Sequence, residues 1–264
     1  MRLSCAISTV ALLVLSCNVN AFTISSNSRT GASFQLNFGP AGKTMNGEVD
    51  TGFIATELRG AAMKLHTKSQ APKEGQVEDV KPAKPHDTTH MDYLKFLVNS
   101  QHVYRAMEEI VMMDELPELA PFVNTGLERT EALEKDIEFM CAEYELERPE
   151  VGDRGIAYAK QMHEIADKGS EGVPEFMCHY YNHYFAHTAG GMMIGKMMSE
   201  KLLDKKTLNF YKWDGNIAQI KKDVKQSIED MAAKWSREEK DRCVDATMAA
   251  FSGGGGLNAY LGGQ

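Results

Sequence analysis

One histidine near the start of the chain, His66, has neighbours that suit metal ligation. Arg59 and Ala62 precede it by seven and four residues, so the three lie on nearly one face of a helix predicted over residues 52–67. A neutral imidazole is a good ligand for iron, and its second ring nitrogen usually needs a fixed acceptor, for which Gln70 is a candidate. A lone histidine beside an apolar face is more often an ordinary core or surface residue, so both interpretations stay open.

A second candidate site is a helix that contains much glycine. Gly190, Gly191 and Gly195 fall inside a long helix predicted over residues 174–203. Each interior glycine costs about 1 kcal/mol relative to alanine, so three cost on the order of 3 kcal/mol. A helix without side chains on one patch can bend and lie against a flat ligand, with room for a diatomic molecule beneath the bend. Tight helix packing or a simple kink would explain the same glycines equally well.

The same helix carries His179, His183 and His187 at intervals of four residues, which places them on one stripe. This stripe raises the alternative of a helical zinc-binding protein. No cysteine or acidic residue at matching spacing completes a tetrahedral ligand set. Moreover, none of the eight histidines follows a Glu by three residues, which disfavours a carboxylate-bridged two-metal bundle.

The elements that position these residues are predicted to be helices alone, because strand-like alternation is nowhere sustained. Pro174 suits a first helical position, and Ser236 with Glu239 has capping-box spacing. Residues 68–90 are rich in Pro and charge and are expected to form an exposed connection, and residues 252–264 a flexible glycine-rich tail. Besides the two helices named above, we predict helices over residues 91–113, 126–144, 153–168, 214–235 and 236–251.

Composition places the chain among single-domain globular proteins of acidic surface. Its 264 residues are 43% apolar, enough for one full core. Residues 47–264 carry 26 basic and 37 acidic residues, a net charge of −11, which argues against a nucleic-acid partner. Cys141, Cys178 and Cys243 are far apart in sequence, so we expect neither disulfides nor an iron–sulfur cluster. Unpaired cysteines are typical of proteins in a reducing compartment, which we therefore expect.

The first 46 residues are expected to be a targeting sequence that is cleaved off. Residues 1–21 have Arg2, a short apolar run and a cleavage-like end at Ala21, which is typical of a signal peptide. Residues 22–46 contain no acid and much Ser, Thr and Asn, as transit peptides do. This two-part leader, with Phe22 after the cut, resembles the plastid-targeting sequences of algae with secondary plastids. Plain secretion is the alternative, and we expect no stable membrane insertion because the apolar run is too short.

Four motifs together resemble the heme oxygenases of plant and algal plastids. They are Ala62-Met-Lys-Leu-His-Thr-Lys68, Asn124-Thr-Gly-Leu-Glu-Arg129, Tyr184-Phe-Ala-His-Thr-Ala-Gly-Gly191 and Phe210-Tyr-Lys-Trp-Asp-Gly215. Their order and spacing match as well, over about residues 52–251. The resemblance implies an all-α, single-domain helical bundle over residues 47–251, with heme between the first helix and the glycine-kinked distal helix.

The resemblance also implies roles for individual residues. His66 matches the proximal iron ligand, while Gly190 and Gly191 match glycines that contact the distal heme face. His187 matches a polar position on the oxygen-binding side, where many relatives outside plastids have Asp. The positions that hold the heme propionates are matched by Arg59, Tyr181, Lys221 and Lys225. Without the resemblance, Lys221 and Lys225 would be read as a solvated basic stripe.

The function implied is oxidative cleavage of heme at the α-meso carbon to biliverdin IXα, CO and ferrous iron. Heme b is then both cofactor and substrate, and the partners are O2, reduced ferredoxin as electron donor and a downstream bilin reductase of chromophore synthesis. No flavin or nicotinamide motif occurs, so electrons must come from outside. A patch of Arg59, Lys64, Lys221, Lys222 and Lys225 could dock an acidic ferredoxin. The alternative is a non-catalytic heme-binding or heme-shuttling protein of the same fold.

Overall fold

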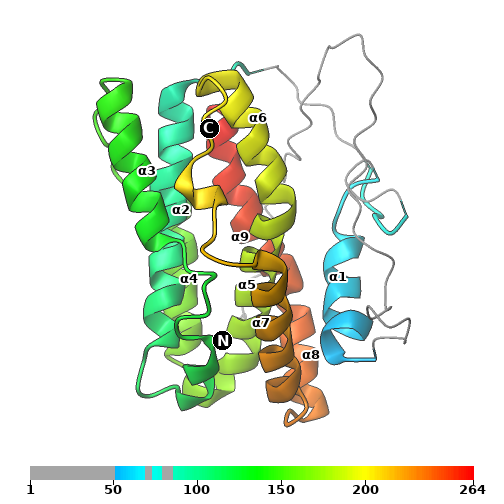
Figure 1. The fold of residues 1–264 in the computed structure, drawn as a ribbon. Helices are drawn as coiled ribbons and strands as arrows, with labels where there is room; N and C mark the ends of the chain where they lie inside the picture. Colours follow the sequence, from blue (N-terminus) through cyan, green and yellow to red (C-terminus); the bar gives the residue numbers. More distant parts are fainter. Residues whose placement is uncertain (1–50, 69–72, 79–85) are drawn as a thin grey trace, which may run out of the picture.

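The fold is a bundle of helices, seen in a computed structural model that describes residues 51–68, 73–78 and 86–264 (Figure 1). Within these residues the only β pairing is an isolated bridge between Thr67 and Val77. No helix among them is both long and apolar enough to cross a membrane. The helical elements are η1 (Ile54–Leu58), α1 (Arg59–Lys64), α2 (His90–Val111), η2 (Pro117–Phe122), α3 (Thr130–Glu143), α4 (Asp153–Ala166), η3 (Gly169–Gly172), α5 (Val173–Ala186), η4 (His187–Gly191), α6 (Met192–Leu202), η5 (Asn209–Tyr211), α7 (Ile217–Ala232), α8 (Arg237–Asp245), α9 (Thr247–Asn258) and η6 (Ala259–Gly262).

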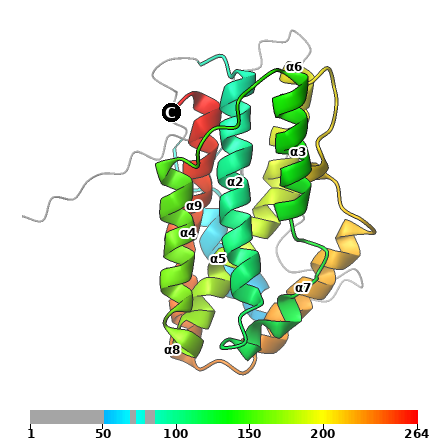
Figure 2. The ribbon, with the colours of Figure 1, turned by 90° about the vertical axis from the view of Figure 1, so that its left-hand side faces the viewer.

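Helix α2 is the buried centre of the bundle and lies between α3 and α4 (Figure 2). It begins with a capping box in which the Thr89 hydroxyl accepts from the Asp92 N–H and the Asp92 carboxylate accepts from the Thr89 N–H. Its inward side chains, among them Leu97 and Met107, have no exposed surface. Burial of this apolar face is what stabilises so long a helix.

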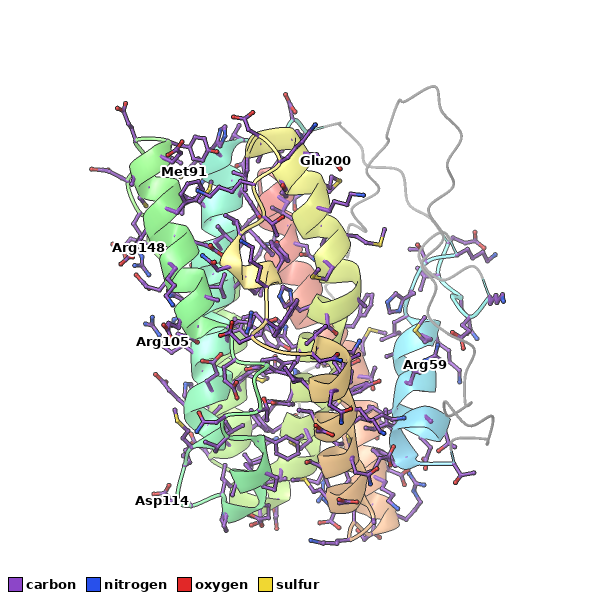
Figure 3. The ribbon with its side chains drawn as sticks, viewed as in Figure 1. Arg59, Met91, Arg105, Asp114, Arg148 and Glu200 are labelled. Atoms are coloured by element: carbon purple, nitrogen blue, oxygen red, sulfur yellow. The ribbon has the colours of Figure 1, made fainter. Side chains whose placement is uncertain are left out.

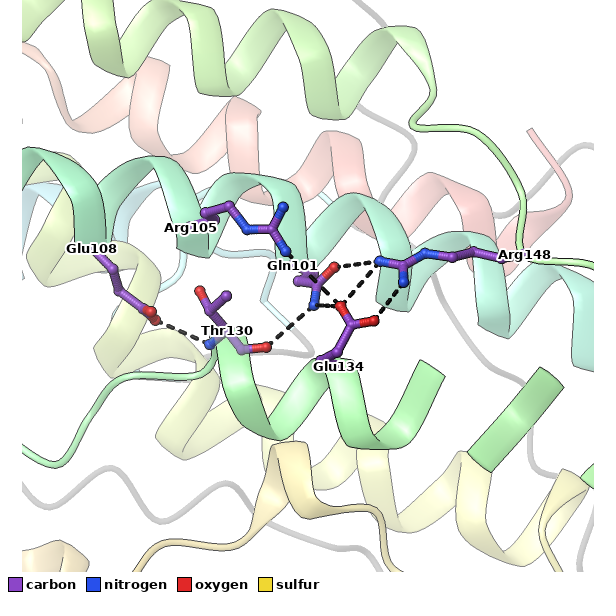
Figure 4. A network of polar contacts seen from close by, with 6 residues as sticks. All are labelled: Gln101, Arg105, Glu108, Thr130, Glu134 and Arg148. Atoms are coloured by element: carbon purple, nitrogen blue, oxygen red, sulfur yellow. Dashed lines mark hydrogen bonds and ion pairs between the residues drawn. The ribbon is translucent and has the colours of Figure 1, made fainter. Parts of the chain in front are cut away.

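A polar network ties α2 to α3 and to the loop before α4 (Figure 4). Glu134 accepts hydrogen bonds from both Gln101 and Arg148, and Arg148 also donates to the Gln101 side-chain oxygen. At the other end of this network, Glu108 accepts from the backbone N–H of Thr130 at 3.1 Å and so satisfies an open donor at the start of α3. The network fixes how α3 sits on α2, and α3 in turn holds the loop described below.

The predicted helix over residues 174–203 is interrupted by a π-helical turn. Helix α5 has Pro174 in its first turn, as expected. The helical backbone then continues without a break through the π turn of His187–Gly191 into α6. A π turn places one extra residue in the turn and changes which side chains of the two flanking helices share a face. The glycine cluster therefore coincides with the interruption of the helix.

The first helical segment lies at one side of the bundle and is held from α7 and α8. The Glu229 carboxylate of α7 accepts from the backbone N–H of Phe53 at 2.7 Å and of Ile54 at 2.9 Å, which caps the start of η1. Arg237 of α8 pairs with Glu57 at 2.8 Å. The helix ends at Lys64, earlier than the predicted Thr67, so His66 stands just beyond its last turn.

The expected flexible tail over residues 252–264 is wrong. Most of that segment is helical, because α9 runs to Asn258 and η6 follows it, and the predicted helix over residues 236–251 is divided at Ala246 between α8 and α9. A Cβ on Gly253 would lie 2.5 Å from ring atoms of Tyr158, so this glycine permits close packing on α4. Leu257 and Leu261 are buried, and this burial outweighs the low helix propensity of glycine.

Candidate active site

His66 is held in the orientation that metal ligation needs. Its Nδ1 lies 3.0 Å from the backbone oxygen of Ala62, so Nδ1 carries the proton and donates, and the lone pair is on Nε2. Burial lowers the pKa of His66, which favours the neutral ligand form. The acceptor for the second ring nitrogen is thus the backbone oxygen of Ala62. Gln70, the acceptor predicted from the sequence, lies outside the described residues. The His66 ring also packs edge-on against Phe251 of α9, with centroids 5.3 Å apart.

The three glycines of the distal segment meet different surroundings. A Cβ on Gly190 would have no heavy atom within 4 Å, whereas one on Gly191 would lie 2.7 Å from the His187 Nδ1 and one on Gly195 2.6 Å from the Tyr211 ring. Gly191 and Gly195 are therefore needed for packing within the protein. Gly190 alone leaves open space beside the π turn, and this fits the presence of a flat ligand against it.

His187 is turned into the core. Its Nε2 donates to the backbone oxygen of Phe210 at 2.8 Å, and its ring stacks on the Phe210 ring with centroids 3.9 Å apart. Burial lowers the pKa of His187 to about 3, so the ring is neutral and its one N–H is already used. The remaining lone pair, on Nδ1, faces the π turn beside Gly191. His187 can therefore accept a hydrogen bond at the turn, but it is not arranged to donate a proton directly.

Two residues that the sequence analysis did not single out hold this arrangement. Asp136 of α3 accepts from the Asn209 and Phe210 N–H groups at 2.8 and 2.6 Å. Arg129 donates to the backbone oxygen of Lys212 at 2.5 Å and lies over the Trp213 ring. The loop around Phe210, whose backbone oxygen accepts the hydrogen bond from His187, is thus held in place by Asp136 of α3 and by Arg129 just before α3. The one sequence signal for Asp136 is an acid on the otherwise apolar face of a predicted helix.

Three of the four residues expected to hold carboxylates, on three different helices, are linked through Phe185 and through an electrostatic interaction. Arg59 of α1 is close enough to Tyr181 of α5 for an electrostatic interaction. The Tyr181 ring packs at a tilt against the Phe185 ring, with centroids 4.6 Å apart, and the Lys221 ammonium of α7 lies 5.8 Å from the centre of the Phe185 ring. Lys225 follows Lys221 by one turn on α7. Figure 3 places Arg59 on the opposite side of the bundle from Arg105 and Arg148.

The histidine stripe does not form a ligand set. His187 is bound to Phe210, and His179 Nδ1 lies 3.0 Å from the Tyr158 hydroxyl, so these rings have separate partners. In the part of the chain that the structure describes, no three His, Cys, Asp or Glu side chains are grouped to hold a metal ion. The residues of the site therefore suit a single imidazole ligand, His66, together with groups that bind carboxylates, better than a four-ligand zinc site.

The sequence profile of the family described as heme oxygenase matches residues 53–253. The chain belongs to the heme oxygenase family. It is 46% identical to chloroplastic heme oxygenase 1 of Oryza sativa subsp. japonica, over 82% of this chain and 73% of the rice protein. It is 43% identical to chloroplastic heme oxygenase 1 of Arabidopsis thaliana, over 76% and 70% of the two chains.

A solved heme oxygenase shares the fold. Heme oxygenase-1 of the cyanobacterium Synechocystis sp. PCC6803, in complex with heme, superposes with a TM-score of 0.56 at 23% identity, over 66% of this chain and 78% of that one. The expectations of an all-α heme oxygenase fold and of an enzyme with heme oxygenase activity are confirmed. The domain limits, apart from the tail corrected above, and the roles of the individual site residues stay predictions.

Proposed function

We propose that the chain cleaves heme at the α-meso carbon to biliverdin IXα, CO and ferrous iron, using O2 and electrons from reduced ferredoxin. The observation that supports this most is the fixed tautomer of His66, which leaves Nε2 as the acceptor, just beyond the helix that carries Arg59. Tyr181 interacts electrostatically with Arg59, and both Tyr181 and Lys221 contact Phe185. An imidazole with a fixed tautomer and a group of carboxylate-binding side chains together suit a porphyrin with two propionates. Biliverdin could then serve a bilin reductase in chromophore synthesis.

Heme supplies the iron that reacts with oxygen and the carbon that is oxidised. The protein's part is to bind, orient and supply protons. His66 would ligate the iron through Nε2, and Gly190 would allow the porphyrin to lie close to the backbone of the π turn. Arg59, Tyr181, Lys221 and Lys225 would hold the propionates and so set the rotation of the ring in its plane. That rotation decides which meso edge faces the distal segment, and hence which biliverdin isomer forms.

His187 is proposed to act through water. Its Nδ1 accepts and its Nε2 proton is committed to Phe210, so a water hydrogen-bonded to Nδ1 would keep its other proton for the distal side. Asp136 and Arg129 contribute by holding the Phe210 loop. This arrangement would supply protons on the distal side without a charged histidine.

The proposed function is tested by adding hemin to the purified mature protein and then a reductant in air. We expect a Soret band typical of histidine ligation, followed by its loss and by the absorbance of biliverdin, with ascorbate or with ferredoxin. A stable Soret band without biliverdin would support the non-catalytic heme-binding alternative. Zinc binding without any Soret band would support the helical metal-binding alternative, and either result would reject the proposal.

Reversing two charges on α7 is expected to weaken heme binding. Lys221→Glu with Lys225→Glu places two anions where two propionates are held, so hemin affinity should fall roughly tenfold, or the isomer of biliverdin should change. Hemin titration and chromatographic isomer analysis measure this. The matched control is Lys160→Glu with Lys168→Glu, which makes the same charge change on α4 and the turn after it. Equal effects of the two double variants would contradict the assignment.

Ferredoxin is proposed to dock on the patch of Arg59, Lys64, Lys221, Lys222 and Lys225. Lys64 and Lys222 are exposed and Lys221 is half-buried. The remaining surface, in a chain of net charge −11 beyond residue 46, repels an acidic donor, so docking depends on attraction to this patch. Because salt screens that attraction, raising the ionic strength to about 0.5 M should slow ferredoxin-driven turnover roughly tenfold. Ascorbate-driven turnover is the control and should change much less. A ferredoxin rate that salt leaves unaltered would exclude this docking surface.

We further propose that the protein acts in the plastid stroma, since the relatives named above are chloroplastic. The proposed signal and transit segments, residues 1–21 and 22–46, lie outside the described residues. Fusing residues 1–46 to a fluorescent protein in an alga with secondary plastids should label the plastid. Export to the medium would instead support the secretory alternative.

A further inference from the structure

Arg59 is already bound to a carboxylate of its own chain. Its Nη1 and Nη2 donate to the two carboxylate oxygens of Glu74 at 2.9 and 2.8 Å, which is the paired geometry that a guanidinium and a carboxylate prefer. The Arg59 side chain is 20% exposed and that of Glu74 34%, so the pair is partly shielded from water. The contact lowers the pKa of Glu74 and raises that of Arg59, so both groups are charged.

The segment that carries Glu74 is fixed next to the iron-ligand candidate. The Val77 N–H donates to the backbone oxygen of His66 at 3.2 Å, and the Lys68 N–H donates to the backbone oxygen of Val77 at 3.0 Å. These two bonds form the bridge between Thr67 and Val77. Glu74 is therefore brought to Arg59 by backbone pairing with the residues around His66, and not only by attraction between two long side chains.

A heme propionate that pairs with Arg59 across the Nη1–Nη2 edge would need the same two N–H groups. The paired donors of one guanidinium edge serve one carboxylate at a time, because both oxygens of that carboxylate are engaged. Resting on the proposed role of Arg59, we propose that Glu74 is an internal competitor for the porphyrin propionate and determines how tightly the site holds a carboxylate-bearing tetrapyrrole. A propionate gains this edge of Arg59 only when Glu74 releases it, so the affinity for the propionate reflects the difference between two similar ion pairs.

This competition acts on product as well as on substrate. Biliverdin keeps both propionates of heme, so the exchange at Arg59 also limits how tightly the opened tetrapyrrole is held. Glu74 then favours release of a ligand that is no longer fixed by His66. We infer that Glu74 is an affinity-determining residue that need not touch the reacting atoms.

The test compares Glu74→Gln with wild type for two ligands, hemin and hemin dimethyl ester, whose propionates are uncharged. Freeing Arg59 should tighten hemin binding roughly three- to fivefold, the effect of one partly exposed ion pair. It should leave the affinity for the dimethyl ester unchanged. Biliverdin should bind tighter by a similar factor, measured by fluorescence quenching of Trp213 and Trp235.

Glu78→Gln is the matched control, because it removes the same charge from the same segment while its partner is Lys68. It should alter neither affinity, and in an Arg59→Gln background Glu74→Gln should have no further effect. Unchanged or weaker hemin binding by Glu74→Gln, or equal tightening for the dimethyl ester, would overturn the inference. A wild-type protein that gives no Soret band with hemin would instead refute the proposed function, so the two failures are distinguishable.

Discussion

Replacing His66 with alanine is expected to abolish biliverdin formation. Nε2 of this ring is the proposed iron ligand, since Nδ1 is bound to the Ala62 oxygen, and outer partners of metal ligands alone are typically worth about 10–100-fold in affinity or activity. Loss of the ligand itself should therefore lower turnover by more than about 100-fold. Turnover is followed by biliverdin absorbance, and the Soret band of the hemin complex should shift because the axial nitrogen is gone.

Added imidazole provides the control for His66→Ala. A small imidazole can occupy the space left by the side chain and should restore the Soret position of the wild type. His102→Ala, which removes a half-buried histidine from α2, should retain turnover. Biliverdin formation by His66→Ala at the wild-type rate would refute the assignment of the iron ligand.

Mild acid is expected to destabilise the heme-free protein through buried histidines, among them His179 and His187, with His183 adding to the effect because burial lowers its pKa to about 4. Burial lowers the pKa of both His179 and His187 to about 3, whereas an unfolded histidine titrates near 6.5. Both are neutral in the fold, so their stability contribution is complete above pH 6.5 and is lost as the pH falls from 6.5 toward 3. At pH 5 each of these two histidines lowers the free energy of unfolding by about 2 kcal/mol relative to pH above 6.5, or by about 4 kcal/mol together.

Urea unfolding at several pH values between 7.5 and 5 measures this loss. Removing one of these titrations, with His179→Phe, should reduce the slope of unfolding free energy against pH by about 1.4 kcal/mol per pH unit below pH 6. The slope is the informative quantity, because the substitution also changes packing at every pH. A slope equal to that of the wild type would show that His179 is not held neutral in the fold.

Features that depend on neighbours in sequence were predictable. The capping box of Ser236 with Glu239, the Pro174 helix start and the interruption at the glycine cluster all follow from residues within a few positions of one another. Local backbone preferences and hydrogen bonds decide such features. His66 and the α7 cations could likewise be named from residue type and spacing, together with the family motifs.

Features that depend on distant contacts were not predictable. The tetraglycine segment appeared flexible by propensity, yet it is helical because Gly253 packs on Tyr158 and Leu257 is buried. His187 could be placed on the distal helix, but its direction depends on the Phe210 carbonyl, which Asp136 positions from another helix. Hydrogen bonds between elements that are far apart in sequence leave no periodic signal along the chain.

By itself, the sequence determined that the chain is helical, which family it resembles, and which side chains could bind iron and carboxylates. Only the tertiary structure decided which atoms those side chains use: the Ala62 oxygen that fixes the His66 tautomer, and the Glu74 carboxylate that occupies Arg59. The physical reason is that residue type sets what a group can bond, whereas the partner it does bond depends on distances and burial that exist only after folding.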